Sequence, residues 1–81
     1  MKIDYLPHAL KALEEVPPPI RNTFFKQLKF LEKNLRHPSL RAKKYSGAED
    51  KWQARINNGW RFYFKIAGQT YIILDIIPHP K

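Results

Sequence analysis

Apolar and polar side chains alternate one by one along the segment 60–66, whose sequence is WRFYFKI. Successive side chains of an extended strand point to opposite faces of a sheet. One face of this strand would therefore be apolar, with Trp60, Phe62, Phe64 and Ile66. The opposite face would carry Arg61, Tyr63 and Lys65. The pattern predicts a sheet with one buried face and one cationic face that contains an aromatic ring.

The preceding segment shows the same alternation, with core positions at Trp52, Ala54 and Ile56. Its outward positions are Gln53, Arg55 and Asn57. Asn58-Gly59 then predicts a hairpin turn of type I′, which needs positive φ at both central positions. The hairpin would bring Arg55 and Arg61 together on one exposed face. Gln53 and Tyr63 would share that face.

A further strand is predicted after the turn Ala67-Gly68-Gln69. The segment 70–77 is nearly all apolar, which is typical of a central strand covered at least partly on both faces. Counting in steps of two puts one set on a common face: Tyr71, Ile73, Asp75, Ile77 and His79. Whether this is the arginine face depends on the register, which the sequence leaves open.

Prolines divide the first half of the chain. A short strand at 2–6 is followed by Pro7, which suits the first turn of a helix over 7–16 with Leu6, Leu10, Leu13 and Val16 at helical spacing. The run Pro17-Pro18-Pro19 ends that helix and opens a second one over 19–36. The second helix has a buried stripe of Ile20, Phe24, Leu28, Leu31 and Leu35. The two helices should form an antiparallel hairpin.

The expected fold class is α+β, with the element order βααβββ in a single domain over 1–81. The helical hairpin would pack on one face of a mostly antiparallel, twisted sheet. Residues 38–50 are polar, and we expect them to be irregular.

Charge narrows the possible partners. The chain has 15 Lys and Arg against 7 Asp and Glu, and the excess lies in residues 21–81, with 13 basic and 4 acidic groups. This favours a polyanion such as nucleic acid, or an acidic protein, although a generic solubilising surface is the alternative. No apolar run approaches the roughly 20 residues of a membrane span, so we expect a cytoplasmic protein without a membrane partner.

The Arg55 and Arg61 pair is the first candidate site. Two like charges close together cost stability unless an anion neutralises them. A guanidinium binds phosphate through two hydrogen bonds and stays charged at any working pH. Ordinary surface charge, or pairing with Asp75 or Glu49, is the alternative interpretation.

Two other features could contribute. His79 lies between prolines, and an imidazole can donate or accept a proton near neutral pH. Lys43, Lys44 and Tyr45 interleave charge with an aromatic ring, which suits an RNA backbone and an unstacked base, unless the segment is simply a flexible loop. The chain has no cysteine, no glycine-rich phosphate loop and no histidine spacing for a metal, so we expect no metal or cofactor.

Together these residues resemble a known family. The segment KKYSGAEDKWQARINNGWRFYFKI, the ending TYIILDIIPHPK and the order βααβββ are similar to the RelE/ParE superfamily of bacterial toxins, over nearly the whole chain. The resemblance implies a RelE-like, microbial-RNase-like fold and a toxin of a type II toxin–antitoxin pair. Its RelE-like branch cleaves mRNA without a metal, usually at the ribosomal A site, by attack of the 2′-hydroxyl on the adjacent phosphate.

The resemblance also implies roles for individual residues. Arg61 matches the arginine that stabilises the phosphate, Arg55 matches a supporting basic position, and His79 matches an acid or base at the end of the last strand. Lys81 matches another basic position, which would hold RNA or aid proton transfer. RNA contacts are expected from Lys43, Lys44, Tyr45, Gln53 and Tyr63. The chain departs from some relatives in lacking a C-terminal tyrosine and in having Gln53, which cannot act as a base, where lysine is common.

The implied partners are an acidic antitoxin in a toxin–antitoxin hetero-oligomer, and mRNA on the ribosome with contacts to 16S rRNA. Two alternatives stay open. The ParE branch shares the fold but inhibits DNA gyrase without cutting RNA. A non-catalytic module that binds only antitoxin or RNA is the other.

Overall fold

The computed structural model describes residues 2–46 and 50–79. Its elements in chain order are β1 (Lys2–Tyr5), α1 (Pro7–Glu15), α2 (Pro18–Lys33), the 3₁₀ turn η1 (Pro38–Leu40), β2 (Lys43–Ser46), β3 (Lys51–Asn57), β4 (Trp60–Ala67) and β5 (Thr70–Pro78). None of the helices in this part of the chain has the length and apolar character needed to cross a membrane.

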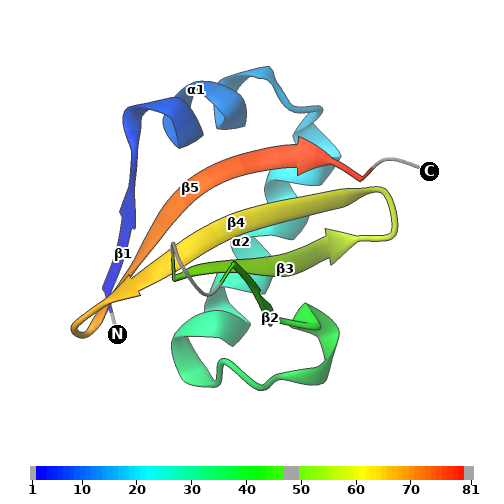
Figure 1. Cartoon of the computed structure of the whole chain (residues 1–81). Coiled ribbons are helices and arrows are strands. Elements are labelled where there is room, and N and C mark those ends of the chain that lie inside the picture. Colours follow the sequence, from blue (N-terminus) through cyan, green and yellow to red (C-terminus); the bar gives the residue numbers. More distant parts are fainter. Residues whose placement is uncertain (1, 47–49, 80–81) are drawn as a thin grey trace.

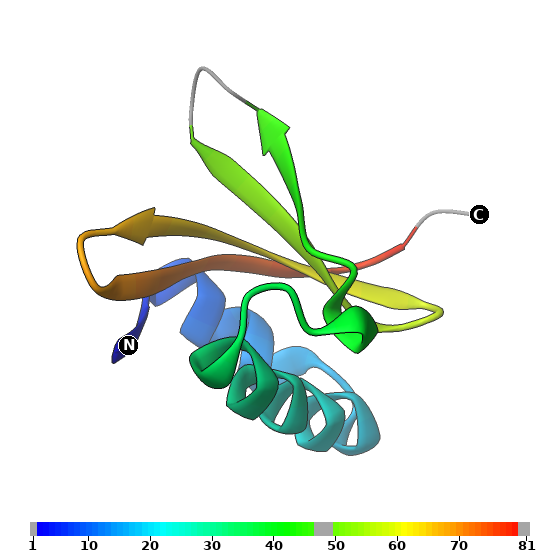
Figure 2. The same cartoon turned by 90° about the horizontal axis from the view of Figure 1, so that it is seen from below.

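The strands form one sheet in the order β1-β5-β4-β3-β2. Strand β1 runs parallel to β5, and the other three pairs are antiparallel. Figures 1 and 2 show both helices on the same side of this twisted sheet, which leaves the other side without a covering layer. The predicted α+β class, with a helical hairpin on one face of a mostly antiparallel sheet, is confirmed.

Strand β2 was not expected, because residues 38–50 were predicted to be irregular. It pairs with β3, where Lys43 lies opposite Gln53 and Lys44 opposite Trp52. A four-residue edge strand with the sequence KKYS has no apolar alternation, so its pairing leaves no signal in the sequence. The η1 turn before it is anchored by Leu40, which is fully buried.

Both helices begin at prolines, as predicted. Helix α1 ends at Glu15, and α2 ends at Lys33 rather than at the predicted 36. Asn34 already has extended backbone, and its side-chain oxygen accepts a hydrogen bond from the Arg36 N–H at 2.9 Å. The chain therefore turns away three residues before the predicted end.

The apolar stripe of α1 is shifted from the predicted one. Leu13 and Val16 are buried as expected, but Leu6 and Leu10 are 39% and 49% exposed. Ala9 is fully buried instead, because a small side chain lets the helix lie close to β5. In α2, Phe24, Leu28 and Leu31 are buried, and the stripe ends Ile20 and Leu35 are half-buried.

Arg21 of α2 joins the two helices. Its guanidinium donates to three carbonyl groups at the end of α1, those of Leu13 (2.8 Å), Glu14 (3.3 Å) and Val16 (3.5 Å). The last carbonyl groups of a helix have no partner within the helix, and a cation is favourable there. One side chain thus closes the helical hairpin.

The core lies between the helices and the sheet and is built on aromatic contacts. The Phe24 ring of α2 meets the Phe62 ring of β4 edge-on, with centroids 5.2 Å apart. Phe64 meets Tyr71 of β5 in the same way at 5.5 Å. Ala54 and Ile56 are buried as predicted, whereas Trp52 and Trp60 are half-buried at the rim of the core.

The Asn58-Gly59 turn differs from the prediction of type I′. Among the described residues only Arg41, Asp50 and Gly68 have positive φ, so neither central position of this turn is left-handed. The register of β3 with β4 shifts between Arg55 and Asn57, and the Asn57 side-chain oxygen accepts from the Gly59 N–H at 2.8 Å. The chain therefore reverses direction without positive φ, through the register shift and the hydrogen bond from Gly59 to the Asn57 side chain. The Gly68 turn was predicted correctly, with φ of 60°.

Strand β5 does not keep the predicted two-residue period. Tyr63 lies opposite Asp75 and Phe64 opposite Ile73, so β5 has an extra residue, Leu74, at a bulge. Tyr71 and Ile73 are therefore buried against the helices, while Ile77 lies opposite Arg61. The expectation that Tyr71, Ile73, Asp75, Ile77 and His79 share one face was wrong. The bulge moves the end of β5 onto the arginine face.

Candidate functional site

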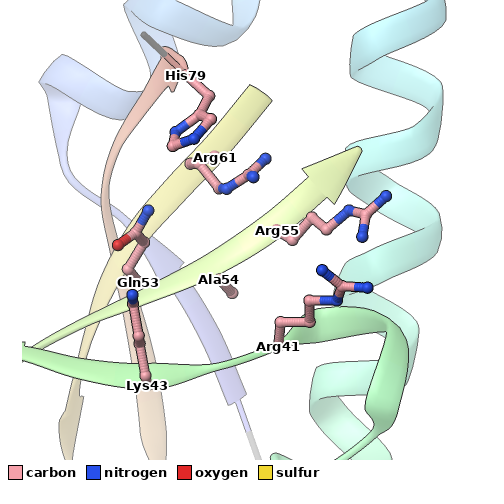
Figure 3. Close-up of a pocket in the computed structure, with 7 residues that line it drawn as sticks. All are labelled: Arg41, Lys43, Gln53, Ala54, Arg55, Arg61 and His79. Carbon is pink, nitrogen blue, oxygen red and sulfur yellow. The ribbon is translucent and has the colours of Figure 1, made fainter. Parts of the chain in front are cut away.

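A pocket of about 290 Å³ opens beside the arginine face of the sheet. Its lining residues, drawn in Figure 3, are Arg41, Lys43, Gln53, Ala54, Arg55, Arg61 and His79. Five of these seven were predicted site residues, and they come from three strands and the C-terminal end of β5. The lining contains five basic side chains and no carboxylate.

Strand register explains how the pocket is assembled. Arg55 lies directly opposite Arg61 in the β3–β4 pair, and Lys43 lies opposite Gln53 in the β2–β3 pair. The bulge in β5 adds His79, whose backbone N–H donates to the Gly59 carbonyl at 2.8 Å. Figure 3 shows the His79 imidazole beside Arg61.

The β3–β4 turn orients both arginines. The Nη1 atom of Arg61 donates to the Trp60 carbonyl at 2.9 Å and to the Asn57 and Asn58 carbonyls. The Nη2 atom of Arg55 donates to the side-chain oxygen of Asn58. All hydrogen bonds of Arg61 within the described residues use Nη1, so its Nε and Nη2 can face a bound anion. A guanidinium held in this way is a preorganised binder of phosphate.

The charges of the pocket are not balanced within the described residues. Burial, and then the neighbouring Arg55 and Arg41 guanidinium groups, lower the pKa of Arg61 from its ordinary value. Asp75, a possible partner of the arginines, instead lies 3.3 Å from Nε2 of His8 on α1. Glu49, the other possible partner, lies outside the described residues. An anion placed among the arginines would relieve their repulsion.

Arg41 is the pocket residue that sequence reasoning missed. It follows η1 and has left-handed backbone, with φ of 46°, which is uncommon for a residue other than glycine. Its guanidinium, like that of Arg55, lies close enough to Arg61 to help lower the pKa of Arg61. Only its place in a basic segment hinted at a role, because a side chain in an irregular segment has no face that a period can predict.

Tyr45 and Tyr63 form an aromatic cluster next to the pocket. Their ring centroids are 5.3 Å apart, and the Lys51 Nζ lies 4.9 Å from the Tyr63 ring and 5.7 Å from the Tyr45 ring. Tyr63 follows Arg61 by two residues on the same strand face, and Tyr45 is 58% exposed. Burial first, and then Tyr45 and Asp75, raise the pKa of Tyr63, so its hydroxyl stays neutral at working pH. The cluster offers flat aromatic surface beside the cationic pocket.

Lys44 is a predicted site residue that is described but is not part of this arrangement. Lys44 lies opposite Trp52, on the other face of β2, and its Nζ is 3.0 Å from the Asp50 carboxylate. Lys81 lies outside the described residues. The structure therefore brings together Lys43, Gln53, Arg55, Arg61 and His79, adds Arg41, and places Tyr45 and Tyr63 alongside.

Comparisons with known proteins place the fold. No protein-family model matches the chain, and no curated protein sequence is significantly similar. Solved structures do match. The YoeB/ParE toxin from Agrobacterium tumefaciens superposes with a TM-score of 0.80 at 14% identity, covering 99% of this chain and 100% of that one.

Two toxin–antitoxin complexes give similar values. The archaeal RelE–RelB complex from Pyrococcus horikoshii contains a chain with a TM-score of 0.79 at 20% identity, covering 95% of this chain and 92% of that one. The intact E. coli RelBE complex contains one with a TM-score of 0.77 at 16% identity, covering 99% and 98%. The chain therefore has the fold shared by the RelE, YoeB and ParE toxins, as the sequence resemblance implied.

Proposed function

We propose that this protein is the toxin of a type II toxin–antitoxin pair and a metal-independent endoribonuclease that cleaves mRNA at the ribosomal A site. The observation that carries the proposal is the pocket itself. Three arginines, a lysine and a histidine meet there, with Lys43, Arg55 and Arg61 on strands, and no carboxylate is among the lining residues. Such a site is suited to a phosphodiester, because it offers positive charge and a group able to transfer a proton.

The proposed reaction is an internal transesterification. The ribose 2′-oxygen loses its proton, forms a bond to the adjacent phosphorus, and the bond from phosphorus to the 5′-oxygen breaks as that oxygen takes up a proton. The products are a 2′,3′-cyclic phosphate and a 5′-hydroxyl. Arg61 stabilises the extra charge on the pentacoordinate phosphate, supported by Arg55 and Arg41. His79 serves as acid or base, because an imidazole can both donate and accept a proton.

The remaining predicted residues would hold the RNA. Lys43 and Gln53 line the pocket, and the rings of Tyr45 and Tyr63 offer stacking surface to neighbouring bases. Lys44 and Lys81 would contact the backbone of mRNA or 16S rRNA outside the pocket. The aromatic cluster favours single-stranded RNA, whose bases are free to stack.

The proposed protein partner is an acidic antitoxin, which binds in a hetero-oligomer in the cytoplasm. Two structures with the same fold were solved as complexes: the archaeal RelE–RelB complex and the E. coli RelBE toxin–antitoxin complex. The net charge of +8 supports an acidic partner, since complementary charge speeds association and suppresses wrong partners.

Primer extension on an mRNA in a reconstituted translation system tests this proposal. The wild-type protein should cut within codons positioned on the ribosome, and Arg61→Ala should cut at least about 10²-fold more slowly. Lys29→Ala is the matched control, because Lys29 is an exposed cation on α2 outside the pocket lining. It should cut at the wild-type rate.

The same preparation separates the alternatives. Absence of cleavage by the wild-type protein, together with inhibition of DNA gyrase supercoiling, would replace the nuclease with a ParE-like gyrase inhibitor. Absence of both activities, with tight binding of RNA or of an antitoxin, would leave a non-catalytic binding module.

A further inference from the structure

Gln27, in the middle of α2, is the one buried polar side chain among the described residues, with an exposed fraction of 5%. It occupies a position in the apolar face of the helix, next to the buried Leu28. A side-chain amide in such a place costs free energy unless its donors and acceptor are paired. Its hydrogen-bond partners therefore indicate what it does.

The Gln27 amide joins three elements. Its Nε2 donates to the backbone carbonyl of Arg55 in β3 at 2.9 Å and to that of Ser39 in η1 at 3.1 Å. Its Oε1 accepts from the Ser39 hydroxyl at 3.3 Å. One buried side chain from α2 thus holds the backbone of both β3 and η1.

The bond to Arg55 substitutes for a missing strand partner. Strand β2 pairs with β3 only between Lys51 and Gln53, so Arg55 lies beyond the end of that pairing. A backbone carbonyl needs a partner when it is shielded from water, and here the amide of Gln27 is that partner. The position of the Arg55 backbone therefore depends on α2.

The hydrogen bonds from Gln27 to Ser39 restrict the position of Arg41 through the η1 turn. Ser39 and Arg41 are two residues apart, and the Arg41 N–H donates to the Pro38 carbonyl at 3.3 Å. The η1 turn is held to α2 a second time by His37, whose ring stacks on Phe30 with centroids 4.0 Å apart. Arg41 thus projects from a turn that is anchored to α2 at both His37 and Ser39.

We propose that Gln27 is a positioning residue, which sets the placement of Arg41 relative to Arg55 in the pocket. Both arginines also line a second cavity, of about 400 Å³, together with Gln27 and Ser39, so the four residues are neighbours in space. The role of the arginines in RNA binding rests on the proposed function, whereas their placement by Gln27 rests on the hydrogen bonds alone. Displacement of a catalytic group by about 1 Å can cost about 10²-fold in rate.

The test uses Gln27→Met, which keeps the length of the side chain and removes its donors and acceptor. Leu28→Ala is the matched control, because it removes core packing at the next position of the same helix and leaves the amide in place. The probe is a single-stranded RNA with 2′-O-methyl groups throughout, which cannot be cleaved, and binding is measured by fluorescence anisotropy at a temperature where every variant is folded.

We expect Gln27→Met to bind this RNA at least about tenfold more weakly than wild type, and Leu28→Ala to bind within about twofold of it. In the Arg41→Ala, Arg55→Ala background, Gln27→Met should have no further effect, because the groups it positions are gone. Equal losses in Gln27→Met and Leu28→Ala, or an undiminished loss in the double-arginine background, would reduce Gln27 to a core residue and overturn the proposal.

Arginine side-chain NMR keeps the inference separate from the proposed function. If the wild-type protein neither binds nor cuts RNA, the proposed function fails, and the Nε–Hε resonances of Arg41 and Arg55 decide about Gln27. Both should shift in Gln27→Met and stay in place in Leu28→Ala. Resonances at their wild-type positions in Gln27→Met would overturn the positioning role. Gln27→Glu, which keeps the shape and the acceptor and loses the donors, is the second variant if Gln27→Met does not fold.

Discussion

The two faces of β3 and β4 are built from alternate residues of the same two segments, yet they have opposite physical character. On the helix side, Phe62 and Phe64 are fully buried and pack against the aromatic rings of α2 and β5. On the open side, Arg55 and Arg61 lie opposite each other with no carboxylate among the residues that line their pocket. One face is packed within the folded chain, whereas the like charges of the other face have no carboxylate beside them among the described lining residues.

Neighbouring residues of one strand therefore serve different purposes: those on the packed face stabilise the fold, and those on the open face carry the candidate site. The packed face fixes the backbone of the strands, and that rigid backbone then holds the like charges of the open face in place. The arginine cluster adds to burial in lowering the pKa of Arg61, which disfavours the charged side chain in the folded state. Its presence is better explained by an anionic ligand, and the following predictions test that division.

The largest loss of stability is expected on the packed face. Phe62→Ala should lower the free energy of unfolding by about 3–5 kcal/mol, because a fully buried ring is replaced by a cavity between β4 and α2. Urea denaturation followed by circular dichroism measures this change. A loss below about 1 kcal/mol would show that the core does not lie where the aromatic contacts place it.

A smaller loss of stability is expected at the helical hairpin, which covers the packed face of the sheet. Arg21→Gln should cost about 1–2 kcal/mol, because the guanidinium donates to three carbonyl groups at the end of α1. Arg36→Gln, which removes the same charge at an exposed position after α2, is the control and should be nearly neutral. Thermal melts of the two variants should differ by several degrees, and equal melts would dismiss the role of Arg21.

On the open face, an anion should stabilise the fold. At equal ionic strength, sulfate should raise the melting temperature more than chloride does, by about 4 °C, equivalent to about 1 kcal/mol for a chain of this size. Sulfate also stabilises proteins in general. The informative quantity is therefore the part of the rise that disappears in Arg55→Gln, and an undiminished rise in that variant would argue against an anion site in the pocket.

The smallest change in stability is expected beside Phe62 on the same strand. Arg61→Ala should alter the free energy of unfolding by less than about 1 kcal/mol. Folding lowers the pKa of Arg61, so its charged form is disfavoured in the folded state at every pH below that pKa, neutral pH included. In Arg61→Ala, the free energy gained by removing this disfavoured charge offsets the free energy lost with the hydrogen bonds from Arg61 to the β3–β4 turn. A loss as large as that of Phe62→Ala would erase the distinction between the two faces.

The sequence was informative where side chains follow a period. Alternation predicted the two faces of β3 and β4, with Arg55 and Arg61 on the same exposed face, and the register, which pairs these two residues, confirms this. The type of turn was wrong, because the irregularity at the end of β3 and the Asn57 side chain make the reversal with negative φ. Prolines predicted the beginnings of both helices to within one residue.

The rest of the site depends on features without a sequence period. A bulge in the nearly all-apolar β5 leaves no mark in the pattern, yet it brings the end of that strand, and with it His79, to the arginines. Strand β2 is a short polar edge, and Arg41 enters the pocket through a left-handed backbone conformation that its residue type does not favour. These positions are set by tertiary contacts, among them the buried amide of Gln27.

The most direct test of the central claim is cleavage of an mRNA that has one 2′-deoxynucleotide at a mapped cut site, in the reconstituted translation system. If the open face catalyses attack of the 2′-hydroxyl on the adjacent phosphate, the cut at that site should disappear while cuts at other codons remain, with cyclic phosphate and 5′-hydroxyl ends. A cut that persists at the deoxynucleotide would contradict the mechanism, because the attacking group would then have to come from elsewhere.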